Sequence, residues 1–140
     1  MCLEVKSLVK IAEEDIVCYK HVLGAIPFNN TEKMRFYTLY QHMLVSIGET
    51  YTLEGKLENC FYCGYESDFT SLGKVCVSRG AFHSYSFIGD IALVANKGEA
   101  IIECVIPKGT EYVEGEFCGR KSYASKAITY VRLLRRPYRE

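Results

Sequence analysis

The sequence has no net charge, and this absence excludes one class of partners. Its 140 residues include 17 basic and 17 acidic side chains, so the formal net charge is zero. A protein dedicated to nucleic acids or anionic membranes needs a basic excess or a basic face. We therefore expect no nucleic-acid surface, and we interpret the C-terminal arginines as a solvated tail. They are Arg132, Arg135, Arg136 and Arg139.

Long hydrophobic runs are missing as well. No stretch approaches the ~18 apolar residues that mark a membrane-spanning helix, and residues 1–12 mix acids and lysines into their apolar pattern. Such a start does not match the apolar centre of a signal peptide. We expect no membrane partner and a cytoplasmic protein, in which the seven cysteines need not pair. Cys18, Cys76 and Cys104 lie in apolar, strand-like runs, where free thiols act as small buried hydrophobes.

The common catalytic signatures are also absent. The sequence contains no G-x-G-x-x-G, no G-x-x-x-x-G-K-[ST] and no H-E-x-x-H motif. Its cysteines and histidines supply candidates for a thiol–imidazole pair, but no family signature selects one of them. We therefore assign no catalytic residue and favour a protein that is not an enzyme.

Cys60 and Cys63 have the C-x-x-C spacing that can place two thiolates on one metal ion. A structural zinc site needs two more ligands, and the sequence has no second C-x-x-C or H-x-x-x-H motif. Cys76 and His83 are the nearest residues that would complete the set. We expect no cofactor and two free thiols, with a zinc ion on this pair as the alternative.

The apolar pattern predicts an α+β fold in a single compact domain, residues 1–140, with a mainly antiparallel sheet of five to seven strands and one or two short helices. Residues 1–15 are expected to form a helix or a strand, residues 54–73 an irregular loop or flap, and residues 135–140 a charged tail. The expected strands are residues 16–22, 36–40, 43–47, 51–53, 99–106, 111–117 and 127–134, with a helix over residues 90–96.

The densest group of polar side chains follows Gly80. His83, Ser84, Tyr85 and Ser86 occupy consecutive positions between a strand-like run and a helix-like run, where binding residues often lie. Hydroxyls and an imidazole can hold a ribose, an amide or a phosphate through hydrogen bonds, and an aromatic ring can stack on a planar base. The alternative interpretation is that His83 caps the helix or satisfies a buried carbonyl.

Several short motifs follow one another in a recognisable order. They are Tyr19-Lys20, residues 45–51, residues 80–84, residues 106–110, Tyr123-Ala124-Ser125 and residues 128–133. Taken together they resemble a small domain of unknown function found in phage and bacterial proteins. The resemblance covers residues 16–134 and implies a non-enzymatic protein of phage or mobile-element type in the cytoplasm of a bacterial host. It would bind a small nucleotide-like ligand and act as a sponge or inhibitor in host–phage conflict.

The same order of elements is similar to a reduced ADP-ribosyltransferase, a family that binds NAD between two sheets. That resemblance puts Lys20 or His21 at the early basic position and residues 84–86 in place of the central Ser-Thr-Ser. The family's late glutamate has no direct match, because residues 121–123 occupy its place. Without that glutamate, the positive charge that develops in the transition state loses its nearest stabilising group. The nearest substitutes are Glu111, Glu114 and Glu116.

The leading prediction is therefore a pocket for a nucleotide-like ligand. An ADP-ribosyltransferase-like enzyme acting on NAD is one alternative, and a module that binds a host protein through an exposed strand or the arginine tail is the other. A net charge of zero also favours self-association, so we expect a homodimer. The predicted ligand-binding residues are Tyr19, Lys20, His21, Arg79, His83, Ser84, Tyr85, Ser86 and Tyr123.

Overall fold

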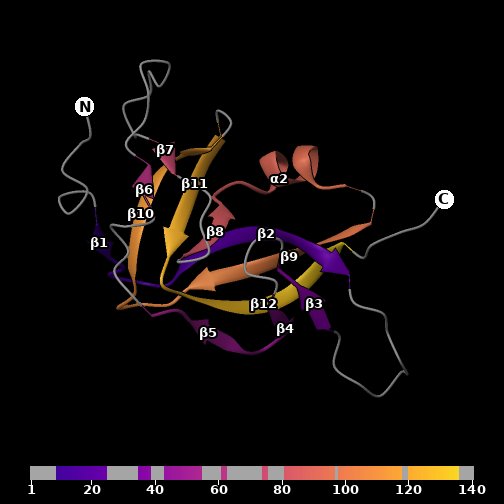
Figure 1. Cartoon of the computed structure of the whole chain (residues 1–140), viewed down its shortest axis with the longest axis horizontal. Helices are drawn as coiled ribbons and strands as arrows, with labels where there is room; N and C mark the ends of the chain where they lie inside the picture. The colour runs from indigo at the N-terminus through magenta and orange to yellow at the C-terminus, as the bar shows by residue number, and fades with distance from the viewer. Residues whose placement is uncertain are drawn as a thin grey trace.

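The computed structural model describes residues 9–24, 35–38, 43–54, 61–62, 74–75, 81–96, 98–117 and 120–135. These residues form one curved sheet with a short helix, α2 (Ile88–Val94), on one side (Figure 1). The strands pair antiparallel except where β10 meets β7, which confirms the mainly antiparallel sheet. The predicted number of strands is wrong, because the sheet has twelve strands instead of five to seven.

Many of the additional strands are too short for their hydrophobic alternation to be recognised in a sequence. Among the described residues, several strands contain only two or three residues each. The strands are β1 (Lys10–Ile11), β2 (Ile16–Gly24), β3 (Arg35–Tyr37), β4 (Leu44–Ser46), β5 (Thr50–Thr52), β6 (Phe61–Tyr62), β7 (Lys74–Val75), β8 (Phe82–Tyr85), β9 (Glu99–Ile106), β10 (Glu111–Phe117), β11 (Arg120–Ser125) and β12 (Ala127–Arg135).

The sheet changes direction where β2 meets β8. The strand order is β5-β12-β9-β2-β8-β11-β10-β7-β6, and Figure 1 shows β10 and β11 upright while β2, β9 and β12 run across them. β2 pairs with β9 along its length, from Ile16 opposite Ile106 to Leu23 opposite Glu99. In contrast, β2 pairs with β8 through Tyr19 and Tyr85 alone in the described residues. The two halves of the sheet are therefore joined by a narrow junction.

The neighbouring strands β2 and β9 are covered by packed side chains on both faces. Because successive side chains of a strand point to opposite faces, Ile102 packs into the main core while Ile101 packs under α2. We call the face of the sheet that packs into the main core the inner face. Cys18, Val22 and Tyr130 also belong to this core. We call the opposite face, which packs against α2, the outer face. It contributes to a smaller cluster of Tyr85, Ile91 and Ile101, with Tyr19, Ala95 and Leu134 packed against it.

The turns of the chain follow their local chemistry. Residues 107–110 form a turn, in which the Thr110 amide donates to the Pro107 carbonyl at 3.1 Å. Gly109 has a φ of 88°, a left-handed conformation that favours glycine. The helix covers Ile88–Val94 instead of residues 90–96, a shift of two residues towards the N-terminus. Within the described part of the chain, no helix has the length and apolarity required to cross a bilayer.

Some predicted segments fall wholly or partly outside the described residues. Of residues 1–15 the structure describes 9–15, in which Lys10–Ile11 form β1. Of the flap predicted at residues 54–73 it describes only residue 54 and β6. Of the charged tail predicted at residues 135–140, the structure describes residue 135 alone.

Candidate functional site

The pleat of β2 sends its three predicted site residues to opposite faces of the sheet. Tyr19 lies on the outer face against the cluster under α2, and the His21 ring lies 6.1 Å from the Tyr85 ring, centroid to centroid. Lys20, between them, turns into the inner face and is 6 % exposed. The structure therefore brings together Tyr19, His21 and Tyr85 on one face.

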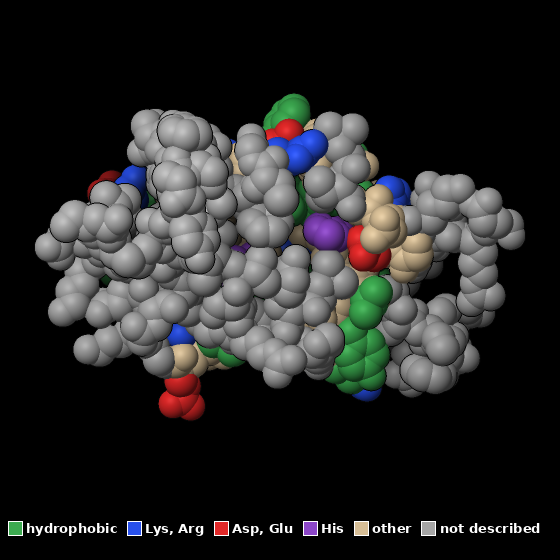
Figure 2. All heavy atoms as spheres, turned by 45° about the horizontal axis from the view of Figure 1, so that its top comes forward, with side chains coloured by type: hydrophobic (Ala, Val, Ile, Leu, Met, Phe, Trp, Pro, Cys, Tyr) green, Lys and Arg blue, Asp and Glu red, His purple; other side chains and the backbone are tan. Residues whose placement is uncertain are grey.

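His21 is held by a carboxylate that the sequence did not single out. Its Nδ1 lies 2.7 Å from Glu99 Oε1, and the two side chains are 15 % and 9 % exposed. Glu99 also accepts a hydrogen bond from the Asn96 amide at 3.0 Å and from Asn96 Nδ2 at 3.4 Å. Figure 2 shows histidine and acidic side chains lying next to each other at the surface of this side of the molecule.

The hydrogen bonds around Glu99 favour its charged form. Burial on its own would raise the pKa of this carboxyl, but the hydrogen bonds from the Asn96 amide and from His21 outweigh it and lower the pKa. An ionised Glu99 accepts a hydrogen bond from Nδ1, and Nε2 is the ring nitrogen that this contact leaves free. The described residues offer Nε2 no hydrogen-bond partner. The pair therefore presents a nitrogen of fixed orientation.

The end of β12 supports this arrangement from a third strand. An Arg135 guanidinium nitrogen donates to the Asn96 carbonyl at 2.7 Å and to the Glu99 carbonyl at 3.0 Å. These bonds fix the backbone on both sides of the turn that carries Glu99. The sequence assigned Arg135 to a charged tail, whereas the structure places it at the last position of β12.

Lys20 fills the gap where β2 and β8 separate. Its Nζ donates to the His83 carbonyl at 2.6 Å, and this is its one hydrogen bond among the described residues. Burial lowers the pKa of Lys20, and only the nearby Cys104 and Cys18 thiols oppose that effect. The amine therefore acts as a hydrogen-bonded bridge inside the protein, with its side chain turned away from the outer face.

The other predicted residues are distributed over β8 and β11. Ser84 is buried on the inner face next to the Cys18 thiol, a weak acceptor. Tyr123, opposite Ser84 in the ladder, packs edge-on against Tyr112, and burial is the main cause that raises the pKa of Tyr123 to about 12. The Ser86 hydroxyl, in contrast, is 3.4 Å from the Lys121 carbonyl on the exposed side.

The remaining candidates are His83, which lies two positions before Tyr85 on β8 and therefore on the same face of the sheet, and three residues outside the described part of the chain. Arg79, Cys60 and Cys63 lie outside the described residues. The role of Arg79 in the ligand site and the zinc ion on Cys60 and Cys63 therefore stay predictions. The side chain of His83 is half-buried, and its strand continues towards Tyr85.

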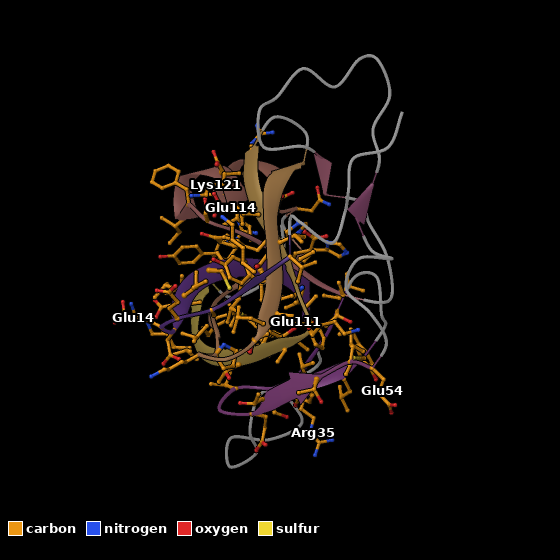
Figure 3. The ribbon with its side chains drawn as sticks, turned by 90° about the vertical axis from the view of Figure 1, so that its left-hand side faces the viewer. Glu14, Arg35, Glu54, Glu111, Glu114 and Lys121 are labelled. Atoms are coloured by element: carbon orange, nitrogen blue, oxygen red, sulfur yellow. The ribbon has the colours of Figure 1, made fainter. Side chains whose placement is uncertain are left out.

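The substitute glutamates of the transferase resemblance lie on another part of the sheet. Glu114 pairs with Lys121 at 3.3 Å across β10 and β11, and Figure 3 shows these two side chains close together, with Glu111 lower on the same strand. The side chain of Glu116 lies outside the described residues. The carboxylate that faces the early histidine is instead Glu99.

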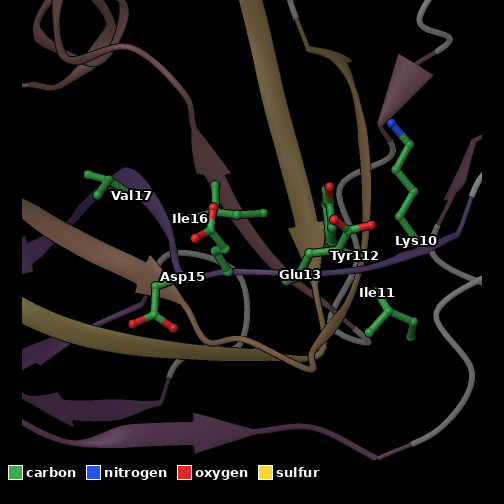
Figure 4. A pocket seen from close by; sticks show the side chains of 9 residues that line it. Lys10, Ile11, Glu13, Asp15, Ile16, Val17 and Tyr112 are labelled. Carbon is green, nitrogen blue, oxygen red and sulfur yellow. The ribbon is translucent and has the colours of Figure 1, made fainter.

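A separate groove opens beside β1 and the loop that follows it (Figure 4). It has a volume of about 790 Å³ and contains none of the predicted ligand-binding residues. Ile11 and Val17 expose 55 % and 49 % of their surface along it. Its lining is Lys10, Ile11, Ala12, Glu13, Glu14, Asp15, Ile16, Val17 and Tyr112.

Comparison with known proteins gives no match to a family model, to a curated protein or to a solved structure. The function must therefore be inferred from the side chains themselves. Glu99 and Asn96 are the functional candidates that sequence reasoning missed. One signal was present, since Glu99 is a carboxylate at the start of a mostly apolar strand. Its partner could not be identified without the pairing of β2 with β9.

Proposed function

We propose that this protein binds a small nucleotide-like ligand on the outer face of β2 and β8, with His21 as the central contact. The observation that carries the proposal is the 2.7 Å contact between His21 and Glu99, which leaves Nε2 without a partner in the described residues. An imidazole held in one orientation by a carboxylate is suited to a specific hydrogen bond, because its ring plane is fixed.

The neighbouring side chains complement such a ligand. The Nε2 atom can form a hydrogen bond with a ribose hydroxyl or with a polar group of a base. Tyr85 has its ring 6.1 Å from that of His21, and Tyr19 lies in the same cluster, so aromatic surface is available for a planar base. The negative charge of Glu99 favours a ribose or amine over a phosphate at this position.

A thermal-shift screen of the protein against NAD, ADP-ribose, cyclic dinucleotides and mononucleotides tests the proposal. A ligand at about 100 times its Kd should stabilise the fold by ~2.7 kcal/mol, which is a shift of several degrees. The shift should disappear in His21→Ala and persist in Ile11→Ala, whose exposed side chain lines the groove beside β1. A flat response to every nucleotide, or an unchanged shift in His21→Ala, would contradict the proposal.

A second candidate is an enzyme that cleaves NAD, favoured by the carboxylate beside His21. In that case Glu99, and neither Glu111 nor Glu114, would supply the negative charge that stabilises the transition state. NAD turnover should then be lost in Glu99→Gln and retained in Glu114→Gln. Intact NAD after long incubation with the wild-type protein would exclude this activity.

A third candidate is a protein-binding module, favoured by the groove beside β1. Its acids, Glu13, Glu14 and Asp15, adjoin the exposed Ile11 and Val17, a combination that suits a basic peptide with apolar side chains. Such a peptide should bind the wild type and lose affinity for Ile11→Ala. The role of sponge or inhibitor in host–phage conflict rests on the resemblance and stays a prediction.

A further inference from the structure

Two cysteines face each other at the centre of the sheet. Cys18 on β2 is directly opposite Cys104 on β9, in the ladder that runs from Ile16 and Ile106 to Leu23 and Glu99. Both cysteines are free thiols, and both are fully buried. The proposed ligand site uses neither of them, because they lie on the inner face.

The backbone at this position meets the requirements of a disulfide. Directly opposed residues of an antiparallel pair have Cα atoms about 4.5–5.5 Å apart and side chains on the same face. Disulfides occur at Cα separations of roughly 4.4–6.8 Å. The register between β2 and β9 is continuous from Ile16 to Leu23, unlike that of the neighbouring ladder between β9 and β12. The register therefore places the two sulfurs where a disulfide across the ladder can form.

The reduced thiols have weak partners in this environment. Cys104 Sγ is 3.8 Å from the Ile102 carbonyl, and Cys18 adjoins the Ser84 hydroxyl. Burial raises the pKa of Cys18 to about 11 and the pKa of Cys104 well above its ordinary value, and the nearby Lys20 amine only partly opposes this. The reactive thiolate therefore forms when the sheet opens locally and water reaches the pair. A disulfide would replace two buried S–H groups with an apolar link.

We propose that Cys18 and Cys104 form a redox-active dithiol that a small-molecule disulfide converts into a cross-strand disulfide. The Cys18 thiolate attacks one sulfur of the oxidant, forms a mixed disulfide and releases one thiolate. The Cys104 thiolate then attacks the Cys18 sulfur and releases the second. The cysteines lose two protons and two electrons, and the oxidant becomes two thiols.

The narrow junction between β2 and β8 provides the access route. Both sulfurs are buried, so the oxidant reaches them only when the sheet opens locally. Cys18 immediately precedes Tyr19, the β2 residue that pairs with β8. Because few backbone bonds hold this junction, it should open before the long ladder between β2 and β9.

Trypsin mapping under non-reducing conditions tests the proposal. Cleavage after lysines places Cys18 in peptide 11–20 and Cys104 in peptide 98–108, each with a single cysteine. The protein is incubated with glutathione disulfide in urea just below its unfolding midpoint, and the remaining thiols are alkylated. We expect the two peptides to be linked and to separate after reduction. Recovery of both as separate alkylated peptides, or linked to other cysteines, would overturn the proposal.

Matched variants and a stability readout complete the experiment. The oxidised protein should unfold at a temperature several degrees higher than the reduced protein, because the link closes a long loop. This shift should be lost in Cys18→Ala and in Cys104→Ala and should persist in Cys76→Ala. A fully unfolded sample provides the reference for random pairing, and equal yields of the 11–20/98–108 link in both samples would also overturn the proposal.

Discussion

At the scale of single residues, the two charged side chains near the centre of the sheet behave in opposite ways. Lys20 has one hydrogen bond and no carboxylate partner in the described residues, so burial works against its charge. Glu99 has three hydrogen-bond contacts that favour its charge. The same strand pair therefore destabilises one ionised group and stabilises the other, and each effect has its own dependence on pH.

Replacing Lys20 with Met should remove a pH-dependent part of the stability. The folded protein holds this proton more weakly than the unfolded chain, whose lysine pKa is about 10.4. Between the lowered pKa of the folded state and the unfolded value, the unfolded state binds more protons, so wild-type stability rises with pH in that interval, by at most ~1.4 kcal/mol per pH unit. Urea unfolding between pH 7 and 9 should show this slope in the wild type and lose it in Lys20→Met.

The buried thiols set the upper limit of pH 9 for this measurement. Burial raises the pKa of Cys18 from 9.0 to about 11, so above pH 9 the unfolded chain loses thiol protons first and stability falls. Lys10→Met, at an exposed position, is the control and should keep the wild-type slope. Equal slopes in the wild type and Lys20→Met would contradict the assignment of a lowered pKa to Lys20.

Replacing Glu99 with Gln should destabilise the protein at neutral pH by about 1–3 kcal/mol, the usual range for a hydrogen bond to a charged group. The pKa of Glu99 is lower in the folded state than its ordinary value of 4.5. Its contribution is therefore complete above that value and is lost as the pH falls through the folded pKa. Urea unfolding at pH 7 and pH 3 should show a smaller difference between variant and wild type at pH 3.

The neighbouring carboxylate provides a control for this experiment. Glu103 binds Arg132, whose side chain is 67 % exposed, and such surface pairs contribute little. Glu103→Gln should therefore change stability less than Glu99→Gln at pH 7. A Glu99→Gln effect that is the same at both pH values would show that charge is not the source of its stabilisation.

At the scale of elements, the strands predicted correctly are those with long apolar or β-branched runs. Residues 99–106 and 111–117 match β9 and β10, because each run is long enough to identify a strand. β8 and β11 were missed as strands. Their buried positions include Ser84, Ser122 and Ser125, and a buried serine looks polar in a sequence.

The candidate site was predictable only in part for a related reason. The sequence selected Tyr19, His21 and Tyr85, whose residue types suit binding, and the structure brings these three together. It did not predict Glu99, because the contact with His21 depends on the register of two strands far apart in the chain. Strand alternation also separates Lys20 from its neighbours, a distinction that a list of polar residues does not contain.

The turn between β9 and β10 gives a prediction for a single element. Gly109 has a φ of 88°, and a Cβ there would meet no atom within 4 Å, so the cost of Gly109→Ala comes from the backbone alone. We expect a loss of about 1–2 kcal/mol in the free energy of unfolding. Gly98→Ala also meets no atom within 4 Å but has no left-handed φ, and it should be nearly neutral. Equal losses in urea unfolding would contradict this explanation.

At the scale of the whole molecule, the pairing of β2 with β9 serves both stability and the proposed site. Its inner face carries the main core, and its outer face carries His21, Glu99 and the residues under α2. A change on one face is therefore expected to act differently from a change on the other, although the residues are adjacent in the chain.

Ile102 and Ile101 allow this difference to be measured. Both are buried isoleucines on β9, but Ile102 belongs to the main core and Ile101 to the small cluster with Tyr85 and Ile91. Ile102→Ala should lower the free energy of unfolding by about 2–5 kcal/mol, as cavities in well-packed cores do. Amide protection should fall in many strands at once, because the core holds residues of β2, β3, β4, β8, β9, β11 and β12.

Ile101→Ala should instead concentrate its effect on the outer face. Ile101 is opposite His21 in the ladder and packs under α2, so its loss should accelerate amide exchange in residues 88–94 and weaken any ligand bound at His21. Exchange in β10 and β11 should remain close to that of the wild type. Uniform loss of protection in both variants would show that the two faces unfold as one unit, and that the outer face cannot rearrange for a ligand without opening the core.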